Sequence, residues 1–176
     1  MALPVSLDEA KAQLRILDDE QDIEIEGFIR DAASWVEDYT GHILEPRAAT
    51  EQFDQRGPVH LKAWPIADGQ PVLVDHEAPD GTVTSIAGAK IRTERRPAFV
   101  FGSNGTLWPF PANAGTRFSV TVEAGYDDPQ DVPRNLRRAM LVLIGGYDAD
   151  REGGEVFQAA EKTAMSLCRH FKYRKL

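Results

Sequence analysis

Between Leu136 and Ile144, apolar side chains surround almost the whole circumference of a predicted helix. Asp131 suits the N-cap of this helix, and Pro133 suits its first turn, where a missing N–H needs no partner. The pair Gly145–Gly146 predicts that the helix ends or bends near Tyr147. A helix with so narrow a polar face is typically surrounded by its own chain or by neighbouring subunits.

The N-terminal region predicts a short helix. Ser6 and Glu9 have the spacing of a capping box, in which each side chain binds the other residue's backbone N–H. The apolar residues Leu7, Ala10 and Leu14 follow at helical spacing, so the helix has a single apolar face.

A second, longer helix is predicted directly afterwards. Asp18 and Asp19 interrupt the first helix and can cap the second, whose first turn is rich in acidic residues. Apolar residues then recur at intervals of three and four between Ile25 and Tyr39. Gly41 follows at the position where a left-handed residue commonly ends a helix.

After Pro46 the pattern changes for about eighty residues to short β-branched and aromatic runs separated by proline and glycine. The alternation of Phe118, Val120 and Val122 with polar residues is typical of a half-buried strand. Strands are predicted near residues 50–55, 59–62, 72–76, 83–86, 90–93, 98–101 and 117–123. The pattern favours a small antiparallel sheet or barrel-like insertion between two helical halves.

The C-terminal region predicts a last helix after Gly153–Gly154, with an apolar stripe between Val156 and Phe171. The final eight residues contain four basic residues, two aromatic residues and no acidic one. We expect this tail to dock on another protein through Arg169, Phe171, Lys172, Tyr173, Arg174 and Lys175. The alternative is that the tail extends the last helix and packs on its own subunit.

Composition narrows the class of protein. The longest apolar runs are too short for a membrane span, and the N-terminus has no signal-peptide pattern. Cys168 is the single cysteine, which excludes a disulfide framework and a cysteine-cluster metal site and suggests a reducing, cytoplasmic compartment. A chain of 176 residues is long enough for one ordinary core, or for a helical domain with a small insertion.

The charge is unevenly distributed. Residues 1–40 hold eleven acidic and three basic side chains, while the remaining 136 residues hold equal numbers of each. Solvated helix faces are one interpretation, and contacts between copies of the chain are the other. Three arginines in the first turns of the helix predicted at residues 134–147 oppose its dipole and favour an external anion. The candidate subunit contacts are Asp18, Asp19, Glu20, Asp22, Arg134, Arg137 and Arg138.

No catalytic, cofactor or metal site is predicted. The sequence has no phosphate-binding glycine loop, nucleophile elbow or helical zinc motif, and its four histidines are scattered. In the Asp75–His76–Glu77 cluster, alternate residues of a strand point to opposite faces, so only the two acids can converge. The acids at residues 148–155 are interpreted as a solvated turn between helices, and the tryptophans as core or interface residues.

Two stretches together resemble a known family. The first is SLDEAKAQLRI followed by a helix ending WVEDYTGHIL, and the second is VTVEAGYDDPQDVPRNLRRAMLVLIGGYDADRE. Both resemble the head–tail connector (adaptor) proteins of long-tailed phages, prophages and gene transfer agents. The resemblance covers about 90 residues at the two ends, and the middle is similar only in being β-rich with a Trp64–Pro65 element.

The resemblance implies an α+β fold, a connector core of about four helices with a small antiparallel β insertion between the second and third helices. Residues 1–45 and 126–176 are expected to form the core and residues 46–125 the insertion. It also implies a non-enzymatic subunit of a dodecameric ring beneath the portal protein, without a cofactor or membrane contact. The ring would extend the DNA channel without sequence-specific binding and receive a tail-side connector or stopper protein. The particle would assemble in the bacterial cytoplasm.

Two other functions stay open at this stage. The chain is alternatively a small intracellular binding or regulatory domain with a ligand pocket in the β insertion. A metal-dependent hydrolase rests only on the acidic clusters and would need Asp75.

Overall fold

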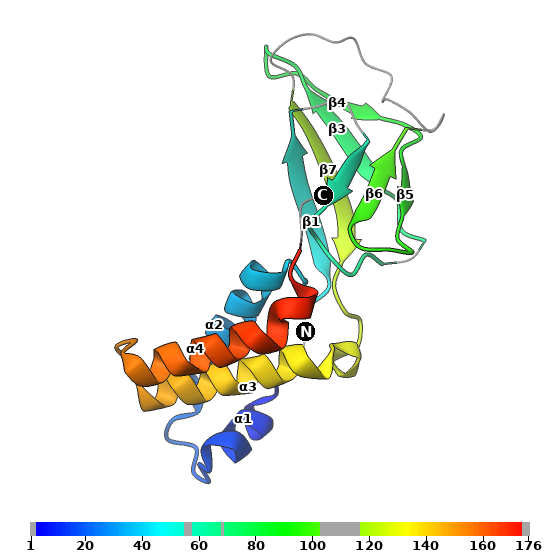
Figure 1. The fold of residues 1–176 in the computed structure, drawn as a ribbon. Helices are drawn as coiled ribbons and strands as arrows, with labels where there is room; N and C mark the ends of the chain where they lie inside the picture. Colours follow the sequence, from blue (N-terminus) through cyan, green and yellow to red (C-terminus); the bar gives the residue numbers. More distant parts are fainter. Residues whose placement is uncertain (1–2, 55–57, 68, 103–116, 174–176) are drawn as a thin grey trace. The chain divides into compact units, whose positions relative to one another are not determined.

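A computed structural model describes residues 3–54, 58–67, 69–102 and 117–173. The chain divides into two compact units. A helical unit contains the residues before Pro46 and after Gly125, and a β unit spans Pro46–Gly125. Within these described ranges, four α-helices and antiparallel sheets make the fold α+β, as expected from the sequence (Figure 1).

Helices α1 (Leu7–Leu14) and α2 (Asp22–Thr40) begin the helical unit. The predicted capping box is present, with the Glu9 N–H donating to Ser6 Oγ at 3.2 Å and the Ser6 N–H to Glu9 Oε2 at 3.1 Å. Gly41 has φ 73° and ends α2, also as predicted. The prediction that Asp18 or Asp19 caps α2 is wrong, since the N-cap is Gln21, which makes no side-chain capping hydrogen bond. The Asp19 carboxylate binds Lys11.

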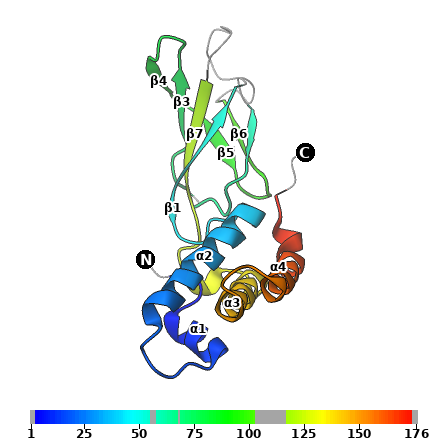
Figure 2. The same cartoon turned by 90° about the vertical axis from the view of Figure 1, so that its left-hand side faces the viewer.

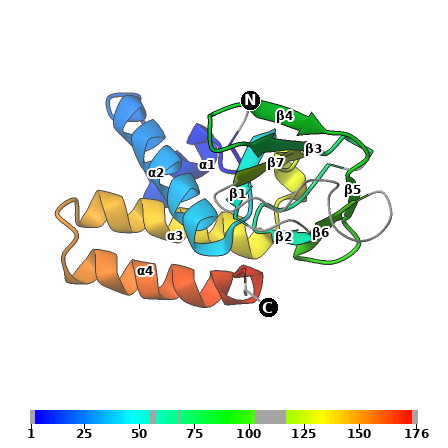
Figure 3. The same cartoon turned by 90° about the horizontal axis from the view of Figure 1, so that it is seen from above.

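Helices α3 (Arg134–Ala149) and α4 (Glu155–Cys168) lie side by side in Figures 2 and 3. The 3₁₀ helix η1 (Pro129–Asp131) precedes α3, and η2 (Arg169–Phe171) follows α4. Asp131 does not cap α3 as predicted, since it lies in η1 and the N-cap of α3 is Pro133. The η1 turn is capped by Asp128, whose carboxylate accepts a hydrogen bond from the Gln130 N–H at 2.8 Å.

Gly145 and Gly146 lie inside α3 and do not end it. Gly146 is buried where α3 meets α4, and a Cβ at this position would lie only 2.8 Å from the Cβ of Ala160. The absence of a side chain therefore lets the two helices approach closely. A Cβ on the neighbouring Gly145 would meet no atom within 4 Å.

The core of the helical unit is centred on α3, which packs against α1, α2 and α4. Its fully buried side chains include Leu136, Met140, Leu143 and Ile144, matching the apolar stretch of the sequence. From α2, Ile25, Ile29 and Val36 complete the core. Helices of the same subunit therefore bury most of the apolar surface of α3.

The described residues of the β unit form seven antiparallel strands in two sheets. The strands are β1 (Arg47–Phe53), β2 (Val59–Leu61), β3 (Leu73–Glu77), β4 (Val83–Ile86), β5 (Lys90–Arg92), β6 (Ala98–Phe101) and β7 (Arg117–Ala124). One sheet has the order β1-β7-β3-β4 and the other β2-β6-β5. Buried residues alternate along β7, with Phe118, Val120 and Val122 facing the core as their period-two pattern predicted.

Candidate interaction surfaces

The acidic loop, defined here as residues 17–23, joins α1 to α2 and includes the first residues of α2. Lys11 Nζ lies 2.6 Å from Asp19 Oδ1 and 2.8 Å from Asp22 Oδ1. These hydrogen bonds raise the pKa of Lys11, and the bond from Lys11 lowers the pKa of Asp19. Two of the predicted contact acids are therefore fixed to their own subunit, while Asp18 and Glu20 are exposed.

The acidic loop also carries two exposed apolar side chains. Leu17 is 97% exposed and Ile23 is 90% exposed, the largest values among the large apolar residues described. A single exposed leucine is ordinary on a protein surface. Here, however, Leu17 and Ile23 lie on either side of a run of acidic residues. Because Lys11 fixes the loop, the result is a preorganised surface with both apolar and negative groups.

The three arginines expected to contact another copy lie at the start of α3. Arg137 donates to Glu9 Oε1 through Nη2 and to Gln130 Oε1 at 2.9 Å through Nη1, so its charge is matched within the subunit. The Nη1 group of Arg138 donates to Gln13 Oε1 at 3.4 Å. With Arg134 and Leu141 these residues line a shallow depression of about 240 Å³.

The described part of the C-terminal segment packs on the end of α2. The Tyr173 N–H donates to the Thr40 carbonyl at 3.1 Å, and Lys172 Nζ lies 4.6 Å from the centre of the Tyr39 ring. The Phe171 ring meets His42 edge-on at 5.5 Å. Arg169 and His170 are exposed. Of the predicted tail residues, Arg174 and Lys175 lie outside the described residues.

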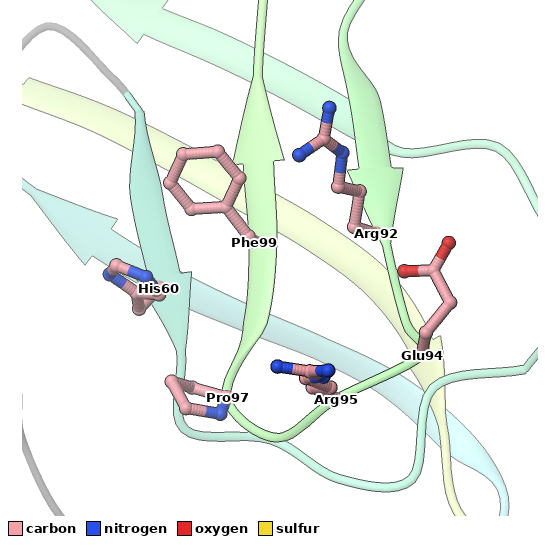
Figure 4. A pocket seen from close by; sticks show the side chains of 6 residues that line it. All are labelled: His60, Arg92, Glu94, Arg95, Pro97 and Phe99. Carbon is pink, nitrogen blue, oxygen red and sulfur yellow. The ribbon is translucent and has the colours of Figure 1, made fainter.

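A surface that the sequence did not predict lies on the three-stranded sheet. The outward positions of its adjacent strands hold His60, Lys90, Arg92, Phe99 and Phe101, and we call these residues the aromatic–basic face. Figure 4 shows three of them, His60, Arg92 and Phe99. The Phe99 ring lies 5.0 Å from His60 and 5.8 Å from Phe101, and the Arg92 guanidinium lies 5.0 Å from the Phe101 ring centre.

This aromatic–basic face borders an open depression of about 640 Å³. Its lining is His60, Arg92, Glu94, Arg95, Pro97 and Phe99, drawn as sticks in Figure 4. The positively charged groups outnumber the single carboxylate. Sequence reading missed the surface because its residues are up to 41 positions apart in the chain, and only the register of β2, β6 and β5 brings them together.

The cluster Asp75–His76–Glu77 has the geometry of an ordinary strand. Asp75 accepts a hydrogen bond from Ser85 Oγ at 2.6 Å, while His76 is buried against Phe118 on the opposite face. No group of three or more metal-binding side chains occurs in the described ranges. Within those ranges, no helix is long and apolar enough to cross a membrane.

Comparison with known proteins finds a similarity to phage head-tail connector proteins over part of the chain. Residues 4–65 match the family model of phage gp6-like head-tail connector proteins. No curated protein sequence matches the chain. The resemblance to head–tail connectors of phages and gene transfer agents, first seen in the two terminal stretches, is confirmed.

Solved structures extend the similarity to the whole fold. A chain in "Neck of empty GTA particle computed with C6 symmetry" has a TM-score of 0.76 and 18% identity, covering 100% of this chain and 94% of that one. A chain in "Virion of native gene transfer agent (GTA) particle" gives 0.75 and 19%, with coverage of 100% and 94%. A third, in "Neck of native GTA particle computed with C12 symmetry", gives 0.69 and 21%, with coverage of 94% and 89%.

Proposed function

We propose that this protein is a structural subunit of a head–tail connector, present in many copies as a ring below a portal protein. The observation that carries the proposal is the similarity of fold over the full chain to neck proteins of gene transfer agent particles, together with the family match of residues 4–65. One of those necks has C12 symmetry, which supports a dodecameric ring. The protein then acts in a virion or phage-like particle that assembles in the bacterial cytoplasm.

The ring extends the DNA channel and receives a tail-side connector or stopper protein. The sequence charge of −8 suits this role, because a basic lining would bind phosphates and retard the passing DNA. DNA passes without sequence-specific recognition. The connector acts by assembly and has no catalytic residue.

Two contacts organise the ring in this proposal. The C-terminal segment, which contains the cationic residues Arg169 and Lys172, docks on the portal protein. Copies meet each other through complementary charge, with the acidic loop of one copy against positive side chains of the next. Arg134, Arg137 and Arg138 are the positive surface predicted from the sequence.

A mass measurement tests the proposal. The purified full chain is mixed with a portal protein of the same particle, and particle masses and negative-stain images are recorded at low and high salt. We expect rings of the chain, alone or on the portal, that weaken as salt rises because exposed ion pairs are screened. A chain that stays monomeric with the portal at every salt concentration would reject the connector function.

The alternative, a binding domain with a pocket in the β unit, has one supporting observation, the 640 Å³ depression. The same experiment separates the two functions, since a monomeric binding domain forms no ring and has no affinity for a portal.

A further inference from the structure

Packing of the β unit does not explain why aromatic and basic residues make up its aromatic–basic face. Its three strands place their small or apolar residues inward, with Val59, Leu61, Ala98 and Val100 all buried. The outward positions hold His60, Lys90, Arg92, Phe99 and Phe101 and no acid. Arginine and aromatic side chains are the types that dominate binding energy at protein interfaces.

The acidic loop of the helical unit has the complementary chemistry. Asp18, Asp19 and Glu20 are exposed acids between two nearly fully exposed apolar residues, Leu17 and Ile23. Lys11 holds Asp19 and Asp22, so the loop loses little conformational freedom when it binds a partner. It offers negative charge and apolar groups to a surface that offers positive charge, aromatic rings and an open depression.

We infer that the acidic loop of one copy docks on the aromatic–basic face of the next copy. The inference rests on the proposed ring, because a closed ring of identical chains joins two different patches of each chain at every contact. Leu17 and Ile23 supply the apolar contacts, toward Phe99 and the depression beside it. Asp18 and Glu20 face Arg92 and Arg95.

The arginines of α3 fit this loop less well. Arg137 already binds Glu9 and Gln130, and Arg138 contacts Gln13, so α1 and η1 of the same subunit occupy part of that surface. The depression there is also smaller, about 240 Å³ against about 640 Å³. The α3 arginines contribute no aromatic ring, while the aromatic–basic face contributes three.

Charge reversal in the full-length chain tests the inference. One variant carries Asp18→Lys and Glu20→Lys in the loop, and the other carries Arg92→Glu and Arg95→Glu on the β unit. All four residues are exposed, so both variants should fold, which circular dichroism checks. Each variant alone places like charges at every contact, and ring formation should need more than about tenfold higher protein concentration than wild type.

Mixing the two variants gives the decisive result. In an alternating ring every contact again joins opposite charges, so an equimolar mixture should form rings near the wild-type concentration. Contacts within one chain would not be restored by mixing. Leu17→Ser provides a milder second variant, expected to weaken assembly without changing charge.

The control is Arg134→Glu with Arg138→Glu in α3. Rescue of the loop variant by this control, and not by the Arg92→Glu, Arg95→Glu variant, would place the loop on α3 and overturn the inference. Normal rings from both β-unit substitutions would also overturn it while leaving the connector function intact. Absence of wild-type rings, alone and with the portal, would reject the connector function itself.

Discussion

Gly146 of α3 lies directly against Ala160 of α4, so close that a Cβ on the glycine would be 2.8 Å from the Cβ of the alanine. Carbon atoms in a packed interior lie about 3.5–4.0 Å apart, so any side chain here must push the helices apart. The contact couples the two helices of the C-terminal hairpin and explains why a glycine is placed inside a helix.

The neighbouring glycines give a matched pair of variants. Gly146→Ala should destabilise the protein by about 1–3 kcal/mol, because overpacking displaces α4. Gly145→Ala meets no atom within 4 Å and should stabilise it by about 0.5–1 kcal/mol, since alanine is the better helix former. Chemical denaturation of both variants measures the two changes. Equal effects of the same sign would contradict the packing assigned to Gly146.

The buried face of α3 gives the second prediction. Leu143 is fully buried among α-helices, so Leu143→Asp places an unpaired carboxylate in an apolar core. We expect a loss of at least about 3 kcal/mol and little soluble protein. Asn135→Asp, at an exposed position in the first turn of the same helix where an acid does not oppose the dipole, is the control and should change stability by less than about 0.5 kcal/mol. A soluble, normally stable Leu143→Asp protein would show that the core is not as described.

Local signals made much of the fold predictable. The capping box at Ser6 and Glu9, the left-handed Gly41 and the alternation along β7 each depend on residues close in sequence. Features that depend on distant partners were missed. The role of Gly146 needs Ala160, and Asp19 was interpreted as a helix cap because its partner Lys11 lies eight residues away.

The interaction surfaces were predictable in part for the same reason. The acidic segment is visible in the composition of residues 1–40, but its exposed leucine and isoleucine are not. The aromatic–basic face requires the pairing of His60 with Phe99 and of Phe99 with Arg92 across strands. No spacing rule along the chain gives that register.

The ion pairs of the acidic loop give a prediction about titration. Asp19 has a lowered pKa because Lys11 donates a hydrogen bond to it. Lys11→Met should therefore raise the pKa of Asp19 toward its ordinary value of about 4. A lowered carboxyl pKa contributes stability above the ordinary value, and this contribution is lost as the pH falls through the lowered one.

Carboxyl NMR titration of the wild type and the Lys11→Met variant measures this shift. Arg15→Met, at the exposed cationic residue that ends α1, is the control and should leave the pKa of Asp19 unchanged. If the pKa of Asp19 is the same in the wild type and in Lys11→Met, then the ion pair between Lys11 and Asp19 does not fix the loop.

Cys168 reports on the packing of α4. Burial raises the pKa of its thiol to about 11, and the side chain is fully buried. Only a very small fraction is thiolate at pH 7, so a thiol reagent should react much more slowly with the folded chain than with the urea-unfolded chain. Gly146→Ala, which displaces α4, should increase the rate in the folded state. Fast labelling of the native wild type would show that the thiol of Cys168 at the end of α4 is accessible to solvent.

The C-terminal segment gives the last prediction. Residues 171–173 contact Tyr39, Thr40 and His42, so part of the segment packs on its own subunit. Phe171 packs at the edge of the helical core and is not among its buried residues. Deletion of residues 169–176 should therefore leave a folded protein, less stable by about 1–2 kcal/mol, whose binding to the portal is lost.

Two substitutions separate the self-contact from docking on the portal. Phe171→Ala removes the ring that meets His42, while Arg169→Glu reverses an exposed charge that no described aromatic contact involves. We expect Phe171→Ala to lower the melting temperature more than Arg169→Glu, which costs only a little stability by placing an acid at the C-cap of α4. Arg169→Glu should instead weaken portal binding, because an exposed rim charge acts mainly on association. Co-sedimentation with the portal protein and thermal unfolding measure the two effects. If the truncated chain and Arg169→Glu both bind the portal as wild type does, the segment is not the anchor, and its aromatic residues serve only to close the end of α2.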